Sequence, residues 1–189
     1  MANRKTAKSK KLRVAFIGAG GIAGAHMRYL SKMDDVEMVA AADVVKSNVD
    51  SRCEEFGIGA GFSDYKKMLA QVKPDAVSVC TPNGLHAPCA IAASNAGAHV
   101  IVEKPLAMNA REGQKMLDAA KKNGRKLVIG FQHRFEPKTQ FIKNAVESGQ
   151  MGKVVYARVQ ALRRRGIPNW GVFGRKDLQG GGPLIDIGD

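Results

Sequence analysis

The chain has 189 residues, enough for one well-buried domain and part of a second. Hydrophobic residues make up 44% of it and charged residues 25%, as in an ordinary globular protein, and the lack of a 20–50-residue repeat argues against a solenoid or propeller. No apolar run approaches the roughly 18 residues that a membrane-spanning helix needs, so no membrane partner is expected.

The formal net charge of +13 is concentrated in part at the start of the chain. Six basic residues stand there without an acidic neighbour: Arg4, Lys5, Lys8, Lys10, Lys11 and Arg13. Such a cluster can bind nucleic acid by counterion release, but it has no aromatic residue for base stacking. Residues 1–11 are therefore interpreted as a basic, disordered leader, and no nucleic-acid partner is expected. The leader also lacks the apolar segment of a secretory signal, so we expect a cytoplasmic protein.

From Leu12 onward, short apolar strands alternate with helical patterns, as is typical of βαβ units and a parallel sheet. The predicted fold class is therefore α/β, with an N-terminal Rossmann domain over 12–133 built on a doubly wound parallel sheet. The predicted strands are 12–17, 36–42, 76–79, 98–102 and 126–130, and the predicted helices are 22–30, 47–56, 64–69, 84–96 and 110–122.

The first strand runs into a glycine-rich turn, Gly18–Gly24, which opens the first helix. Gly18 permits a tight turn, and Gly20 lets the backbone approach a pyrophosphate closely. The N–H groups at Gly21 and Ile22 then face the anion, helped by the helix dipole. Because a strand precedes this pattern and a helix follows it, the turn predicts a dinucleotide site.

Asp43 ends the second strand, where a carboxylate can accept hydrogen bonds from the ribose hydroxyls of the cofactor. A 2′-phosphate would meet its negative charge, so Asp43 favours NAD over NADP. Lys46 and Ser47 follow directly. A cation there can accommodate the extra phosphate, and NADP therefore stays an alternative.

Two further strand ends carry polar residues, in the segments Cys80–His86 and Glu103–Pro105. In open α/β sheets, ligands bind outside the carboxyl ends of the strands. The charged pair Glu103–Lys104, followed by proline, would pack poorly at the end of a buried strand. The presence of this pair is explained if the Lys104 side chain projects into a cleft.

Histidine and cysteine show no pattern of a metal site. Cys53, Cys80 and Cys89 lack both CxxC spacing and a neighbouring histidine cluster, so we expect buried thiols, no disulfide and no metal. His26 and His99 are expected to be structural.

After Gly130 the pattern changes. A helix is predicted over 136–148 and a long strand over 154–162, followed by three arginines at 163–165 that we interpret as solvated. Residues 134–189 are too few for a second α/β domain. They are interpreted as the beginning of a C-terminal domain that is truncated.

Together these motifs resemble the Gfo/Idh/MocA family, which includes glucose–fructose oxidoreductase and inositol 2-dehydrogenase. The matching elements are GAGGIAG at Gly18–Gly24, Asp43, CTPNGLH at Cys80–His86, EKP at Glu103–Pro105, GFQHRF at Gly130–Phe135 and GGGPLIDIG at Gly180–Gly188. The resemblance implies a Rossmann domain followed by an α+β substrate domain with a mainly antiparallel sheet. It implies hydride transfer between nicotinamide and a sugar, inositol or related polyol. It also implies a homo-oligomer in the full-length form.

The resemblance also implies roles for particular residues. Lys104 would border the cofactor, contact the substrate hydroxyl and help its proton transfer. Asp186 would orient the substrate or support the acid–base group. The residues expected to line the nicotinamide side are Thr81, Asn83, His86 and Glu103. A packing role for His86 stays open as an alternative.

The sequence departs from the family at its end. Family members usually carry a histidine two positions after the glycine of the Asp-x-Gly element, and this sequence ends at Asp189. We therefore expect this chain to bind cofactor but to turn over poorly.

Three rival functions stay open. The first is transient oxidation by bound cofactor during glycosidic-bond cleavage, as in some relatives. The second is a non-catalytic, nucleotide-sensing regulator in which Lys104 is idle. The third is nucleic-acid binding through residues 1–11, which predicts an affinity that falls steeply with salt.

Overall fold

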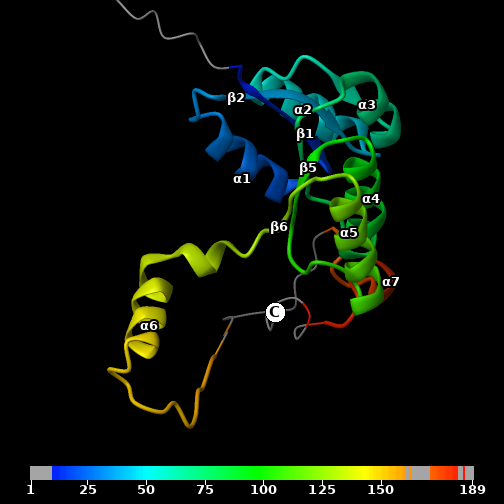
Figure 1. The fold of residues 1–189 in the computed structure, drawn as a ribbon. Helices are drawn as coiled ribbons and strands as arrows, with labels where there is room; N and C mark the ends of the chain where they lie inside the picture. Colours follow the sequence, from blue (N-terminus) through cyan, green and yellow to red (C-terminus); the bar gives the residue numbers. More distant parts are fainter. Residues whose placement is uncertain (1–9, 161, 163–170, 183–184, 186–189) are drawn as a thin grey trace, which may run out of the picture.

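The computed structural model describes residues 10–160, 162, 171–182 and 185. Its centre is a six-stranded sheet of order β3-β2-β1-β4-β5-β6 in which every pair of neighbouring strands is parallel (Figure 1). The strands are β1 (Leu12–Ile17), β2 (Val36–Ala42), β3 (Gly61–Phe62), β4 (Ala76–Val79), β5 (His99–Val102) and β6 (Leu127–Ile129). The strand order reverses between β1 and β4, so the predicted doubly wound Rossmann fold is confirmed.

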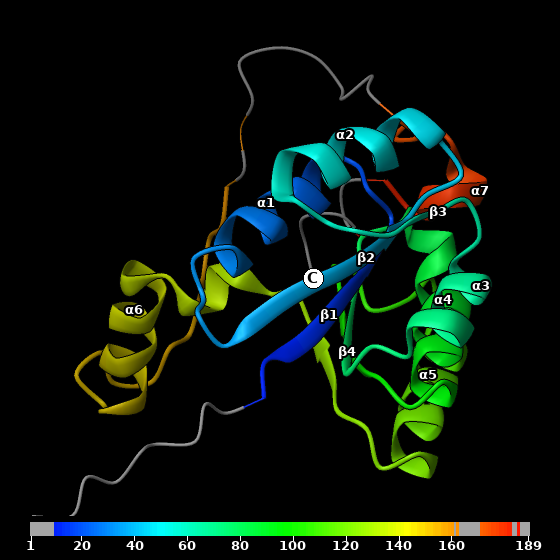
Figure 2. The same ribbon diagram turned by 90° about the horizontal axis from the view of Figure 1, so that it is seen from above.

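Helices cover the sheet on both sides (Figure 2). On one side lie α1 (Gly21–Leu30) and α2 (Lys46–Phe56), and on the other lie α3 (Tyr65–Val72), α4 (His86–Asn95) and α5 (Ala110–Lys122). Phe16 and Met27 are fully buried in the core cluster beneath α1, and Met68 and Met116 are buried in the cluster on the other side. The strands β1, β4 and β5 pair in register up to their carboxyl ends, with Ile17 opposite Val79 and Val79 opposite Val102.

Local sequence signals set where the helices begin and end. The Asp64 carboxylate caps α3 by accepting hydrogen bonds from the N–H groups of Lys66 and Lys67. Asn109 caps α5 in the same way. Gly57 ends α2 in the left-handed conformation, with a φ of 66°.

The chain leaves the sheet after β6 through a 3-10 turn, η2 (Gln132–Phe135), and continues into α6 (Pro137–Glu147). The helix predicted over 136–148 is thereby confirmed. None of its residues is buried, and Figure 1 shows it standing apart from the sheet. A short helix, α7 (Lys176–Gln179), lies beside another 3-10 turn, η1 (Asn83–Leu85), at the start of α4.

The strand predicted over 154–162 is wrong for the described residues 154–160, which form no strand. A strand is stable only when a neighbour satisfies its backbone N–H and C=O groups. Within the part of the chain that the structure describes, the six-stranded sheet contains all the strand pairs, and 154–160 joins none of them. The arginines at 163–165, Asp186 and residues 1–9 of the leader lie outside the described residues.

All three cysteines are free thiols. Cys80 and Cys89 are buried as expected, whereas Cys53 is only half-buried. Within the described ranges, no helix combines the length and apolar character needed to cross a membrane. The boundary between domains near residue 133 stays a prediction.

Candidate dinucleotide site

Three adjacent strands end at the same edge of the sheet. The N–H of Cys80 donates to the carbonyl of Ile17 at 2.7 Å, and the N–H of Glu103 donates to the carbonyl of Val79 at 3.0 Å. The glycine turn after β1, the segment after β4 and the segment after β5 therefore follow one another along this edge. This is the place at which an open α/β sheet binds its ligand.

Gly18 is required by the fold itself. Its φ is +89°, a conformation that side chains rarely adopt, and its N–H donates to the carbonyl of Ala42 at 2.8 Å. A Cβ at this position would lie 2.5 Å from the carbonyl oxygen of Cys80. The turn can therefore pass this close to the end of β4 only with glycine at position 18.

Gly20 and Gly21 are not required by the fold. The φ of Gly20 is −73°, and a Cβ on either residue would meet nothing within 4 Å. No side chain of the described residues caps the first turn of α1, and that turn has no acidic residue. The N-terminus of α1 thus presents its N–H groups to open space, a geometry that fits an anion such as the cofactor pyrophosphate.

Asp43 is tied to this turn. Its Oδ2 accepts a hydrogen bond from the N–H of Ala19 at 2.8 Å, and its Oδ1 accepts one from the N–H of Val45 at 2.8 Å. The carboxylate therefore has a fixed position beside the glycine turn and is only half-buried. Lys46 is differently placed, because its exposed ammonium pairs with Asp50 one turn along α2.

Arg52 is a basic residue at the turn that the sequence did not reveal. Its Nε donates to the carbonyl of Ala19 at 3.4 Å and its Nη2 to that of Gly20 at 3.5 Å. A Cβ on Gly24 would lie 2.7 Å from the guanidinium carbon, so glycine makes room for the cation at this position. Arg52 also pairs with Glu55. Nothing in the helical pattern of α2 distinguishes it, because only the packing of α2 against α1 brings it to the turn.

His86 connects two loops of the site. Its ring is fully buried, with Nδ1 2.7 Å from the carbonyl oxygen of Pro105 and Nε2 3.0 Å from that of Thr81. Burial lowers the pKa of the imidazole below its ordinary value. Both ring nitrogens face backbone carbonyls, so this geometry agrees best with the packing role that the sequence left open.

Asn83 joins the site to the end of the described chain. Its Nδ2 donates to the carbonyl of Gln179 at 3.0 Å, and a Cβ on Gly84 would lie 3.3 Å from the carbonyl oxygen of Asp177. The segment that leads into the glycine run after Gln179 therefore reaches the same sheet edge. Asp186 itself lies outside the described residues.

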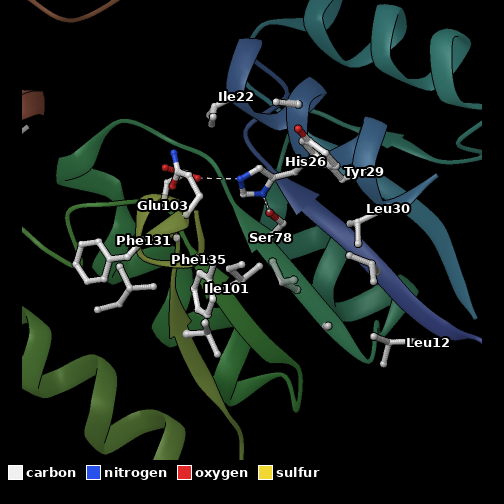
Figure 3. Close-up of a pocket in the computed structure, with 18 residues that line it drawn as sticks. Leu12, Ile22, His26, Tyr29, Leu30, Ser78, Ile101, Glu103, Phe131 and Phe135 are labelled. Carbon is white, nitrogen blue, oxygen red and sulfur yellow. Dashed lines mark hydrogen bonds and ion pairs between the residues drawn. The ribbon is translucent and has the colours of Figure 1, made fainter. Parts of the chain in front are cut away.

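Glu103 and Lys104 sit at the end of β5. The N–H of Lys104 donates to Oε2 of Glu103 at 3.3 Å, and the Lys104 side chain is half-buried. The Glu103 carboxylate is buried and reaches toward α1, where its Oε1 lies 2.8 Å from Nε2 of His26 (Figure 3). A Cβ on Gly130 would lie only 2.9 Å from that oxygen.

His26, which is half-buried, thus forms an ion pair with the buried Glu103 between α1 and β5. Its Nδ1 lies 2.9 Å from the hydroxyl of Ser78 and 3.8 Å from the thiol of Cys80. Hydrogen bonds to Cys80 and to the Glu103 carboxylate raise the pKa of His26 to about 10. The structural role expected for His26 is confirmed, and its partner explains where Glu103 points.

Ser78, His26 and Glu103 have the composition of a hydrolytic triad but not its accessibility. The Ser78 side chain is fully buried and also contacts the Cys80 thiol at 3.4 Å. A nucleophile must reach its substrate. The chain of hydrogen bonds is therefore structural.

Comparison with known proteins identifies the architecture. The sequence model of a family described as "Oxidoreductase family, NAD-binding Rossmann fold" (GFO_IDH_MocA) matches residues 12–131. D-glucoside 3-dehydrogenase of Escherichia coli strain K12 is 45% identical over 181 residues, which are 95% of this chain and 52% of that protein.

Two solved structures show the same fold with ligands. The WlbA dehydrogenase from Bordetella pertussis, in complex with NADH and UDP-GlcNAcA, superposes with a TM-score of 0.73 at 33% identity over 76% of this chain and 44% of its own. Scyllo-inositol dehydrogenase from Lactobacillus casei, with bound NAD(H) and scyllo-inositol, gives a TM-score of 0.71 at 27% identity over 76% and 43%. The chain spans about half the length of the relatives it matches.

Proposed function

Because the chain belongs to the Gfo/Idh/MocA oxidoreductase family, whose Rossmann fold binds NAD, we propose that it forms the cofactor-binding part of a dehydrogenase. The reaction proposed is hydride transfer between nicotinamide and a hydroxyl-bearing carbon of a sugar or polyol. One observation carries the cofactor part of this proposal: the fold leaves Gly20 and Gly21 in front of open space and gives no internal reason for glycine there. A ligand that approaches the backbone supplies the reason.

The residues present fit the dinucleotide. The first turn of α1 would hold the pyrophosphate through its N–H groups, and Asp43 would accept hydrogen bonds from the adenosine ribose. Arg52 would add positive charge beside the same turn. When bound, the cofactor supplies the hydride acceptor or donor at its nicotinamide ring.

Lys104 carries the proton chemistry in this proposal. It follows β5 at the carboxyl edge of the sheet, and its backbone is held by the Glu103 carboxylate. From this position its amine would bind the substrate hydroxyl and move the hydroxyl proton as the carbon is oxidised. Asp186 would orient the substrate, while Thr81 and Asn83 would border the nicotinamide.

The substrate class proposed follows from the relatives. The names of similar proteins specify a D-glucoside dehydrogenase and inositol dehydrogenases, whose substrates all carry ring hydroxyls. We propose the same class here, with NAD preferred over NADP because of Asp43. A cytoplasmic location and a homo-oligomeric state stay predictions.

The test is substrate-dependent NADH formation by the gene product that carries this sequence, with a panel of D-glucosides and inositols. Lys104→Ala should lower the rate by about 10²-fold or more. Lys121→Ala, an exposed lysine on α5, should leave it unchanged. Equal rates for both variants would contradict the role of Lys104, and the absence of turnover with the whole panel would contradict the substrate class.

A further inference from the structure

Two histidines contact the chain on either side of Lys104. Before it, Nε2 of His26 lies 2.8 Å from Oε1 of Glu103 (Figure 3). After it, Nδ1 of His86 lies 2.7 Å from the carbonyl oxygen of Pro105. The two histidines come from α1 and α4, which lie on opposite sides of the sheet (Figure 2). The backbone on both sides of Lys104 is therefore held by side chains from separate helices.

Each histidine is also in contact with β4 or with the segment that follows it. Nδ1 of His26 lies 2.9 Å from the hydroxyl of Ser78, whose side chain is fully buried. Nε2 of His86 lies 3.0 Å from the carbonyl oxygen of Thr81. Because β4 pairs with β1 on one side and with β5 on the other, both histidines connect the chain around Lys104 to a central strand of the sheet.

The Glu103 carboxylate links His26 to the backbone of Lys104. Its Oε1 lies beside the imidazole, and its Oε2 accepts a hydrogen bond from the N–H of Lys104 at 3.3 Å. A Cβ on Gly130 would lie 2.9 Å from Oε1, so glycine directly after β6 leaves room for the carboxylate in this position. A shift of the carboxylate away from His26 would therefore also move the acceptor of the Lys104 N–H.

The surroundings of the ion pair strengthen it. His26 and Glu103 border an apolar groove beside α1, which has a cavity volume of ≈ 520 Å³ and includes Ile22 and Ile101 in its lining (Figure 3). Glu103 has only 7% of its surface exposed. Opposite charges attract more strongly where little water surrounds them, and a buried carboxylate without its cation is strongly unfavourable. Without His26 the carboxylate would turn toward water and release the N–H of Lys104.

We propose that His26 and His86 are positioning residues for Lys104, which they hold from both sides through Glu103 and through Pro105. This role rests on the proposed function, in which the Lys104 amine binds the substrate hydroxyl. A group that transfers a proton must lie within hydrogen-bond reach of its partner, and small displacements lower the rate steeply. Fixing the backbone on both sides of Lys104 limits the displacement of its amine.

Hydrogen exchange of this chain without ligand tests the hold and needs no turnover. His26→Leu and His86→Leu each remove one of the two contacts. Each should speed the exchange of the peptide 103–108 about tenfold relative to the peptide 12–17 in β1, because the chain around Lys104 then opens locally. His99→Leu is the matched control, since His99 begins β5 at the opposite end and accepts a hydrogen bond from the N–H of Lys126. It should leave the ratio of the two exchange rates unchanged.

A milder variant covers the case in which His26→Leu does not fold. His26→Gln removes the charge but keeps a donor for the Glu103 carboxylate, so it should speed exchange of the peptide 103–108 in the same direction and by a smaller factor. A ratio equal to that of wild type in the His26 and His86 variants would overturn the proposal. Equal acceleration of both peptides would also overturn it, because the effect would then be a general loss of stability.

Turnover by the gene product that carries this sequence tests whether the hold acts through Lys104. His26→Gln should lower kcat about tenfold and change the Kd for NADH by less than about twofold. In a Lys104→Ala background, the same substitution should lower kcat no further, because effects of residues that act through one another are not additive. Additive losses would overturn the positioning role. If Lys104→Ala itself leaves the rate unchanged, the proposed function fails, whereas the exchange ratio still decides whether the two histidines hold the chain.

Discussion

At the scale of single residues, the glycines of the Gly18–Gly24 turn are needed for different reasons. Gly18 is fixed by its positive φ and by the carbonyl of Cys80, and Gly24 makes room for the Arg52 guanidinium. Only Gly20 and Gly21 face open space. The motif therefore contains glycines that the fold requires and glycines that only a bound ligand would require. Substitutions can distinguish the two kinds.

The first prediction uses that separation. Gly18→Ala should destabilise the protein by about 2 kcal/mol or more, because the new Cβ adds strain at positive φ and meets the end of β4. Gly20→Ala should leave the midpoint of urea unfolding unchanged and should still weaken NADH binding about tenfold. Equal affinity for NADH in Gly20→Ala and wild type would mean that the turn does not approach the cofactor.

The second prediction concerns the charge of His26. Glu103→Gln should lower its pKa from about 10 part of the way toward the ordinary value, as followed by NMR of the imidazole, because the hydrogen bond to Cys80 remains. Glu54→Gln, an exposed change on α2, should leave it in place. A pKa that does not move in Glu103→Gln would show that the carboxylate is not its partner.

The same ion pair should make stability depend on pH. The folded-state pKa of His26 is raised, so its stabilisation is complete below the unfolded pKa of about 6.5 and is lost as the pH rises toward 10. His26→Gln should cost about 3–5 kcal/mol at pH 7, because it leaves a buried carboxylate without its cation. The difference from wild type in free energy of unfolding should shrink toward pH 10. A difference that is constant from pH 6 to pH 10 would contradict this pair.

At this scale, the direction in which a side chain points could not be predicted from the sequence. Motif and position predicted that Asp43, Asn83, Glu103 and Lys104 lie at one sheet edge, and the strand ends do meet there. The sequence alone did not show that Glu103 turns toward α1. That direction depends on His26, which is 77 positions away in the chain.

At the scale of elements, packing between α1 and α2 brings a cation to the turn. Arg52 is half-buried against the carbonyls of Ala19 and Gly20, whereas Lys46 is exposed and paired with Asp50. Of the two cations on α2, only Arg52 therefore contributes to the field at the N-terminus of α1.

The third prediction follows from that difference. Arg52→Gln should weaken NADH binding about tenfold, the effect of losing one charge-assisted interaction. Lys46→Gln should change the affinity less than twofold. The measurement is a fluorescence titration of each variant, and a larger effect at Lys46 would assign the cofactor phosphates to the start of α2.

Elements with a clear period were predictable, and elements defined by their partners were not. The five strands and five helices expected up to residue 130 all appear, within a few residues of their predicted bounds. The short strand β3 has too few residues to show a period, and it exists because β2 pairs with it. Residues 154–160 show the reverse, since their alternating pattern finds no neighbouring strand.

At the scale of the whole molecule, the described residues leave part of one sheet face and the helix α6 exposed. Apolar side chains are exposed both in the groove beside α1, as at Val128, and on α6, as at Phe141. The chain covers about half the length of its relatives, and α7 returns to Asn83 at the site. The dinucleotide turn, by contrast, is built from β1, α1, β2 and α2 and passes close to the end of β4 at Cys80.

The most direct test of the cofactor site is therefore a titration of this chain with NADH and with NADPH, followed by nicotinamide fluorescence. We expect saturable binding of NADH that is about tenfold tighter than that of NADPH, because Asp43 would repel the 2′-phosphate. Asp43→Asn should remove most of that difference. Saturable binding of neither cofactor at millimolar concentration, or tighter binding of NADPH by wild type, would contradict the account.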